Sequence, residues 1–212
     1  MKKHFVITIG REYGSGGREV GKKLSEKLGV EFYDKELITV AAKKNGMNEK
    51  IFESVDERPT NSLLYSLAMG AYGMEGNYSY WGDLSLPLND RVYQMQADLI
   101  KELAQKSPCV IVGRCADYIL KDFPLLIKLF ITADNDTKIE RVVSQYGVPR
   151  EKAADIIKKT DKKRGNYYDF HTNKAWGGIS NYDLCINITP VGIDNAVEAI
   201  KQYTEIRTGL KF

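Results

Sequence analysis

The sequence predicts an α/β fold in which five parallel strands form one sheet with helices on both faces. The first observation is alternation, because short apolar, β-branched runs alternate with helical patterns along the chain, as in successive strand–helix–strand units. The second is the start of the chain, where the apolar run at residues 4–9 enters a glycine-rich turn and then a helix at residues 17–28. The third is length, since 212 residues suit one domain, 1–212. Ligands of such sheets bind where the strands end.

The other elements follow from the same patterns of period and capping. Further strands are expected at residues 30–33, 109–112, 126–131 and 184–188. Helices are expected at 35–44 after a cap at Asp34, at 90–106, near 116–120, from Asp134 to Gly147, at 151–164 with Gly165 as its stop, and after a cap at Asp194. Residues 51–88, where glycines alternate with aromatic residues, are either a binding insert or oligomer contact or an ordinary loop.

The turn after the first strand has the layout of a phosphate-binding loop. It holds four glycines within eight residues, which let backbone N–H groups approach a phosphate at the start of a helix. Aligned on G-x-x-x-x-G-K-[ST], Arg11 takes the place of the first glycine, Gly17 that of the lysine and Arg18 that of the hydroxyl residue. The alternative is a turn that only packs well. The nucleotide-binding residues that we predict are Gly14, Ser15, Gly16, Gly17, Arg18 and Glu19.

Composition and charge narrow the classes of function. The net charge of +3 is too small to indicate nucleic acid binding. Three cysteines without a C-x-x-C pair indicate a reducing compartment, and Cys109 and Cys185 lie in apolar runs that suggest buried thiols. The chain shows neither a signal peptide nor an apolar run of membrane-spanning length. We therefore expect a cytoplasmic protein with no membrane and no nucleic acid partner.

Polar side chains follow the predicted strands at the edge where ligands bind. Asp34 follows the second strand, and Arg114 and Asp117 follow the third. An arginine directly after an apolar strand and a glycine is placed to bind a phosphate with two hydrogen bonds. With Arg91 on a later helix, these residues form the predicted substrate site. Arg91 and Asp117 have surface roles as their alternatives, and Asp34 also serves as a helix cap.

A basic segment adds two more candidates. Arg141 follows the fourth strand, and Arg164 ends the basic helix just before a glycine-containing loop, where a lid could close over phosphates. Neither histidine has a partner at metal-ligand or triad spacing. Phosphoryl transfer needs no nucleophilic side chain, because it works by positioning and by neutralising charge. The candidate catalytic residues are Arg18, Arg114, Arg141 and Arg164.

At this point the chain resembles the nucleoside monophosphate kinases, specifically the cytidylate kinase-like branch. The resemblance covers nearly the whole chain and is carried by the segments at 10–19 (GREYGSGGRE), 32–37 (FYDKEL), 110–118 (VIVGRCADY), 161–164 (DKKR) and 182–186 (YDLCI). It implies a P-loop NTPase fold with a nucleoside monophosphate-binding insert at about residues 45–90 and a lid at about 147–181. It also implies ATP and Mg²⁺ as cofactors and CMP or dCMP as acceptor, with Ser15 as a magnesium-side hydroxyl.

Two departures keep other functions open. Cytidylate kinases carry a P-loop lysine where this chain has Gly17, and Gly-Arg-Asp where this chain has Gly113-Arg114-Cys115. The missing lysine bears on the efficiency of phosphoryl transfer. The missing aspartate bears on the preference for cytosine. The alternatives are a small-molecule kinase with a non-nucleotide acceptor, and a nucleotide-binding protein without turnover. A homo-oligomer is compatible with all three.

Overall fold

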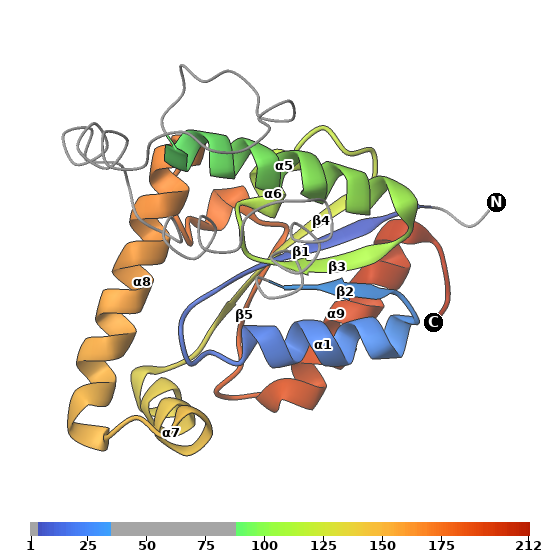
Figure 1. Ribbon diagram of the computed structural model, residues 1–212. Coiled ribbons are helices and arrows are strands. Elements are labelled where there is room, and N and C mark those ends of the chain that lie inside the picture. The colour runs from blue at the N-terminus through green and yellow to red at the C-terminus, as the bar shows by residue number, and fades with distance from the viewer. Residues whose placement is uncertain (1–3, 35–87) are drawn as a thin grey trace.

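The structure, a computed structural model, describes residues 4–34 and 88–212. Within these residues, five strands form one parallel sheet in the order β2-β3-β1-β4-β5 (Figure 1). The strands are β1 (Val6–Arg11), β2 (Glu31–Tyr33), β3 (Cys109–Val112), β4 (Leu126–Thr132) and β5 (Leu184–Asn187). The predicted five-stranded parallel sheet is confirmed. Because all strands are parallel, the loops after them meet at one edge.

The helices are arranged on both sides of this sheet. They are α1 (Gly17–Leu28), α5 (Leu88–Lys106), α6 (Ala116–Ile119), α7 (Asn135–Tyr146), α8 (Arg150–Thr172) and α9 (Gly192–Thr208), with a 3₁₀ helix η1 (Ile179–Asn181). Figure 1 shows α1 and α9 on one face of the sheet and α5 with α6 on the other. Helices α7 and α8 stand beyond the edge where the strands end, so they flank the loops that follow the strands.

Alternation along β1 explains how both faces are filled. Ile7 and Ile9 are buried in the core under α1 and α9, whereas Val6 is buried in the core under α5. Thr8 is also buried, and its hydroxyl donates a hydrogen bond to the Ile127 carbonyl at 3.4 Å. With β3 on one side and β4 on the other, β1 is the central strand. The glycine loop follows its last residue, Arg11.

Three local predictions are wrong. Helix α8 does not stop at Gly165 but continues to Thr172, because an interior glycine costs a helix only about 1 kcal/mol and the burial of Tyr167 and Tyr168 favours the turns that follow. Cys185 is exposed rather than buried, since β5 is the edge strand and alternate residues of it face outward.

The third wrong prediction is the cap at Asp194. Helix α9 begins earlier, at Gly192, so Asp194 lies in its first turn, where a carboxylate is favourable next to the positive end of the helix dipole. Its carboxylate pairs with Lys23 of α1 at 2.6 Å. The predicted helix at 35–44 and the stretch at 51–88 lie outside the described residues.

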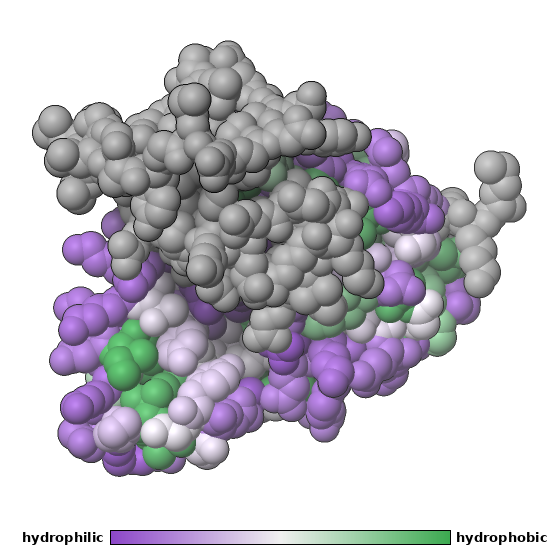
Figure 2. All heavy atoms as spheres, in the orientation of Figure 1, coloured by the Kyte–Doolittle hydropathy of each residue, from purple (hydrophilic) through white to green (hydrophobic). Residues whose placement is uncertain are grey.

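The surface of the described part of the chain is mostly hydrophilic in the view of Figure 2, with a hydrophobic area over the lower ends of α7 and α8. A small core joins these two helices there, made by Val142, Ala153 and Ile157. In residues 4–34 and 88–212, no helix combines the length and the apolar composition that crossing a bilayer requires.

Candidate phosphate-binding site

The loop between β1 and α1 depends on glycine at the positions where it approaches its neighbours. Gly14 and Gly16 have φ angles of 80° and 75°, which side chains other than glycine rarely adopt. A Cβ on Gly14 would lie 2.8 Å from the carbonyl oxygen of Lys138 in α7. Because α1 begins at Gly17, the first N–H groups of this helix have no partner within it, and their positive end faces the loop.

Ser15 is turned into this loop. Its side chain is fully buried, and its hydroxyl donates a 2.8 Å hydrogen bond to the Glu12 carbonyl. The oxygen keeps its lone pairs while the hydrogen is donated, so this hydrogen bond is compatible with a contact to magnesium. The role predicted for Ser15 stays a prediction, but the hydroxyl serves the shape of the loop in this conformation.

Arg141 and Arg164 flank the loop on two sides. The Arg141 guanidinium would lie 3.2 Å from a Cβ on Gly16, and it pairs with Glu19 at 2.8 Å. Arg164 donates to the carbonyl oxygen of Arg11 at 3.2 Å. In both arginines Nε is buried and finds no hydrogen-bond partner among residues 4–34 and 88–212. Buried donors are nearly always satisfied in native proteins, so both Nε groups are able to bind an acceptor from outside the described residues.

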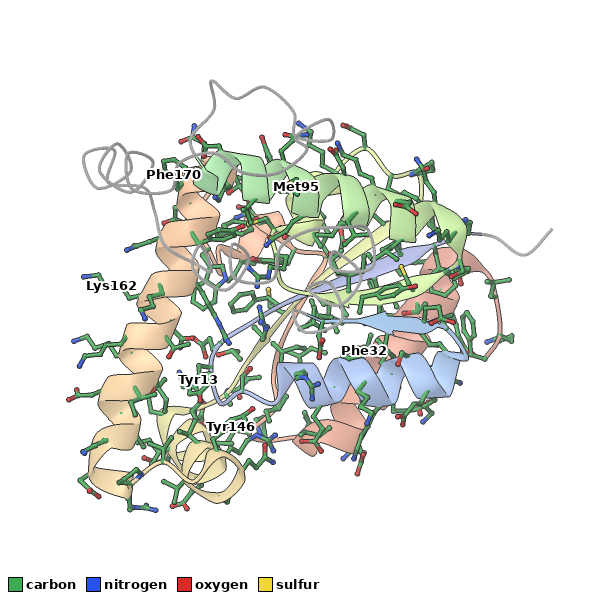
Figure 3. All side chains as sticks on the ribbon, in the orientation of Figure 1. Tyr13, Phe32, Met95, Tyr146, Lys162 and Phe170 are labelled. Carbon is green, nitrogen blue, oxygen red and sulfur yellow. The ribbon has the colours of Figure 1, made fainter. Side chains whose placement is uncertain are left out.

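A side chain of helix α8 also binds the main chain of the loop. The Asp161 carboxylate accepts a 2.7 Å hydrogen bond from the Tyr13 N–H, while its distance to Arg164 is 4.0 Å. Burial raises the pKa of Asp161, and the Tyr13 hydrogen bond opposes this. Tyr13 in turn stacks on Tyr146 of α7 (Figure 3), and Arg164 lies 5.5 Å from the Tyr13 ring centre. The loop is thus fixed to both α7 and α8.

Glu12, Thr132 and Lys138 form a polar group next to the loop that was not predicted from the sequence. Glu12 accepts hydrogen bonds from Thr132 at 2.5 Å and from Lys138 at 3.1 Å. Lys138 is buried, so its charge depends on the pairing with Glu12. Only the general rule that a buried lysine needs a carboxylate could have found this pair, and Lys138 reads as a surface residue in the sequence.

The turn after β3 has an unusual backbone. Gly113, Arg114 and Cys115 have φ angles of 83°, 57° and 54°, and positive φ costs a residue with a Cβ about 1–3 kcal/mol. Arg114 is buried, and it lies against the Tyr167 hydroxyl, where burial raises the tyrosine pKa and a hydrogen bond from Arg114 lowers it. A strained turn that presents a buried arginine is typical of a binding site.

These turns enclose a small cavity. Its walls come from the ends of β1 and β3, from α8 and from the approach to β5, and they include Gly10, Arg11, Gly113, Arg114, Asp117, Arg164, Tyr167, Tyr168, Trp176 and Tyr182. Its volume is about 30 Å³, which is enough for ordered water but small for a ligand. A phosphate would enter only if the side chains around it move apart. The cavity brings Arg114, Asp117 and Arg164 together as predicted site residues.

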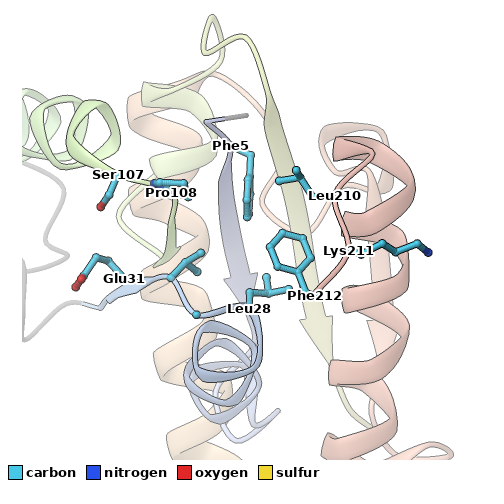
Figure 4. Close-up of a pocket in the computed structure, with 10 residues that line it drawn as sticks. Phe5, Leu28, Glu31, Ser107, Pro108, Leu210, Lys211 and Phe212 are labelled. Carbon is cyan, nitrogen blue, oxygen red and sulfur yellow. The ribbon is translucent and has the colours of Figure 1, made fainter. Parts of the chain in front are cut away.

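A larger cavity lies at the opposite end of the sheet. It measures about 300 Å³ and is lined by residues such as Phe5, Leu28, Pro108 and Phe212 (Figure 4). These residues precede β1, β2 and β3 or end the chain, so this cavity lies away from the glycine loop. It contains none of the predicted site residues.

The remaining predicted residues lie outside the cavity. Arg18 is 56% exposed in its side chain, and its Nε donates a 2.6 Å hydrogen bond to the buried carboxylate of Asp34. Arg91 lies in α5, and its side chain lies outside the described residues. Among the described residues, no group of three His, Cys, Asp or Glu could hold a metal ion.

Comparison with known proteins gives the family. A sequence model of the cytidylate kinase-like family matches residues 6–190. This chain belongs to the cytidylate kinase-like family. No curated protein matches the sequence.

Two solved structures place this member of the cytidylate kinase-like family among known folds. An uncharacterized protein from Eubacterium ventriosum shares 32% sequence identity with a TM-score of 0.71, covering 95% of this chain and 98% of that one. Shikimate kinase from Bacteroides thetaiotaomicron shares 14% identity with a TM-score of 0.53, covering 95% and 98%. The second likeness is one of fold, and it confirms the predicted P-loop fold.

The site of this cytidylate kinase-like protein contains aromatic residues that the sequence did not reveal. Tyr168 donates a 2.6 Å hydrogen bond to Asp117, and Tyr182 lies beside them in the cavity wall. Burial raises the pKa of the Asp117 carboxyl, and the hydrogen bond from Tyr168 lowers it by less. Tyr167 and Tyr168 were missed because α8 was expected to end before them.

The pKa of Asp117 leads to a prediction about stability. Its folded-state pKa is raised, so the folded state binds the proton more tightly, and the free energy of unfolding falls as pH rises from the usual aspartate pKa through the raised one. Asp117→Asn removes this dependence. In urea unfolding, we expect the free energy of unfolding of Asp117→Asn minus that of the wild type to be larger at pH 7 than at pH 4. An equal difference at both pH values would contradict the raised pKa.

Proposed function

We propose that this protein transfers the γ-phosphoryl group of ATP to a nucleoside monophosphate, with CMP or dCMP as the acceptor. The observation that carries the proposal is the pair of buried Nε donors of Arg141 and Arg164, on two sides of the glycine loop, which find no partner among residues 4–34 and 88–212. Phosphate oxygens are acceptors that suit such donors. Family membership supports the same chemistry.

Each part of the site has a task in this reaction. The backbone N–H groups of Gly14 to Gly17 hold the phosphates of ATP. Arg141 and Arg164 neutralise the charge of the transferring group, and α8, which carries Arg164, is the moving part of the lid at residues 147–181. Arg114 binds the phosphate of the acceptor with two hydrogen bonds.

The magnesium ion fits this site as part of the nucleotide. Mg²⁺ keeps several waters and is held by one or two carboxylates together with substrate phosphates, so a dedicated cluster of ligands is not required. Asp34, buried at the end of β2, is the carboxylate that would contact this water shell. When bound, the ion would neutralise part of the phosphate charge.

The proposed acceptor is supported by Asp117 and Arg114, which line one cavity. A carboxylate accepts hydrogen bonds, so Asp117 suits the exocyclic amino group of cytosine, while Arg114 binds the phosphate. The same pair also suits a small acceptor with hydroxyl groups. The fold shared with a shikimate kinase keeps a non-nucleotide acceptor as the second candidate.

An assay of ADP formation tests the proposal. Wild-type protein with ATP and Mg²⁺ is offered CMP, dCMP, UMP, AMP or shikimate, with a sample lacking acceptor as the blank. We expect ADP to form well above the blank with CMP or dCMP, and more slowly with AMP. If ADP forms with shikimate but with none of the nucleotides, the second candidate, a kinase with a non-nucleotide acceptor, is favoured. If no acceptor gives ADP above the blank, the proposal is refuted.

A further inference from the structure

Arg11 and Gly17 occupy one space. Arg11 is the last residue of β1, and Gly17 is the first residue of α1, on the other side of the loop. A Cβ built on Gly17 would lie 2.5 Å from the Cβ of Arg11 and 3.0 Å from its Cγ. Real Cβ atoms do not approach so closely, so any side chain at position 17 would begin where the Arg11 side chain already runs.

The Arg11 side chain continues from there to the turn after β3. Its Nη1 would lie 2.3 Å from a Cβ on Gly113, and its Cζ 2.9 Å, so Gly113 leaves room for the guanidinium. Arg11 lines the small cavity, together with Arg114 and Arg164. The side chain therefore starts beside Gly17 and ends beside Gly113, in the turn after β3.

Position 17 is where a P-loop carries its lysine, whose ammonium contacts the β- and γ-phosphates. In this chain the first glycine of the P-loop pattern is replaced by Arg11, and the lysine is replaced by Gly17. The two departures lie in contact. Both departures have one explanation if the positive charge is carried by Arg11 at the end of β1 and not by a lysine at the start of α1.

Arg18 is less well placed for this role. Its side chain is 56% exposed and its Nε is held by Asp34 at 2.6 Å, at the end of β2. The Arg11 side chain, in contrast, is confined between Gly17 and Gly113. The carbonyl oxygen of Arg11 accepts the hydrogen bond from Arg164. The role of Arg18 stays a prediction, and these contacts favour Arg11 as the replacement for the lysine.

We propose that Arg11 is the catalytic cation of the loop, and that Gly17 is a glycine because the Arg11 side chain fills the space of the P-loop lysine. The inference rests on the proposed phosphoryl transfer. In that step the bond between the γ-phosphorus and the bridging oxygen breaks, its electron pair stays on ADP, and a bond to an acceptor phosphate oxygen forms. Arg11 donates hydrogen bonds to the phosphate oxygens and keeps its proton throughout.

A relocation experiment tests this assignment. Arg11→Met keeps most of the side-chain volume without the charge, and the double variant Arg11→Gly/Gly17→Lys restores the ordinary P-loop arrangement. Arg207→Met, at an exposed ion pair with Asp183 near the end of α9, is the control for loss of a surface arginine. For each protein, kcat, the Kd for ATP and for AMP, and the melting temperature are measured.

We expect Arg11→Met to lower kcat by about 10²–10³-fold, as removal of one preorganised donor does elsewhere, with the melting temperature close to that of the control. The kcat of the double variant should be at least about tenfold higher than that of Arg11→Gly. The kcat of Arg18→Ala should fall much less than that of Arg11→Met. Arg11→Met with wild-type kcat, or a folded double variant no faster than Arg11→Gly, would overturn the assignment. If Arg11→Gly does not fold, Arg11→Met decides alone.

The binding data separate this inference from the proposed function. If the wild type shows no turnover with any acceptor, the proposed function fails, but Arg11 can still bind phosphates. In that case Arg11→Met should weaken ATP more than AMP, because the guanidinium contacts the β- and γ-phosphates that AMP lacks. An unchanged ratio of the two Kd values would refute the role of Arg11 as well.

Discussion

Gly16→Val should abolish tight binding of ATP while the protein stays folded. Gly16 caps α1 with a φ of 75°, and a Cβ there would lie 3.1 Å from Ile193 and 3.2 Å from the Arg141 guanidinium. The valine would push the loop away from the phosphates and displace Arg141. Loss of two charge-assisted hydrogen bonds, each worth about 1.5–3 kcal/mol, corresponds to a Kd at least about a hundredfold higher. Isothermal titration with ATP and Mg²⁺ measures this change.

Gly29→Val is the matched control. Gly29 ends the same helix with a φ of 63°, and a Cβ there would meet no atom within 4 Å. Both variants carry the strain of a left-handed residue, about 1–3 kcal/mol, but only one of them touches the site. Equal losses of ATP affinity in the two variants would show that strain, rather than the loop, sets the affinity.

Arg114→Lys should raise the KM for the acceptor by about 10–100-fold and leave the Kd for ATP unchanged. Lysine keeps the charge but loses the planar pair of donors that binds a phosphate at two points. Because lysine and arginine both carry a Cβ, the strain of the positive φ at this position is the same in both proteins. Steady-state kinetics with varied acceptor and saturating ATP give the KM.

Arg114→Met completes this series. It removes the charge as well, so its acceptor KM should exceed that of Arg114→Lys, with a similar melting temperature. Should the acceptor KM be the same in all three proteins, Arg114 supports the turn and the Tyr167 hydroxyl and does not bind the acceptor.

Much of the fold follows from local patterns. The strands could be predicted because each is a short apolar run between glycines and helices, and the strand-end position of Arg114 followed from its place after Val112 and Gly113. Helix α8 was predicted too short because a glycine at position 165 is typical of a helix end, whereas the burial of Tyr167 and Tyr168 favours further helical turns. The contacts of these tyrosines, such as the hydrogen bond from Tyr168 to Asp117, join residues far apart in the chain, beyond the reach of a local pattern.

The site was predictable in its components and less so in its arrangement. The glycines of the loop and Arg164 follow from composition and spacing, but the contact between Arg11 and Gly17 spans a turn whose shape the sequence does not state. Arg18 was favoured because it is the nearest cation to the expected helix start. Its partner Asp34 becomes apparent only when β2 is placed beside β3.

The destination of the γ-phosphoryl group tests the account most directly. Wild-type protein is incubated with ATP labelled in the γ-phosphate, Mg²⁺ and CMP, and the label is followed among ATP, inorganic phosphate and the nucleotide products. We predict that the label appears in CDP in an amount equal to the ADP formed, with little inorganic phosphate, and that Gly16→Val shows no such transfer. Label found only in inorganic phosphate, or remaining in ATP with every acceptor tested, would contradict phosphoryl transfer at this site.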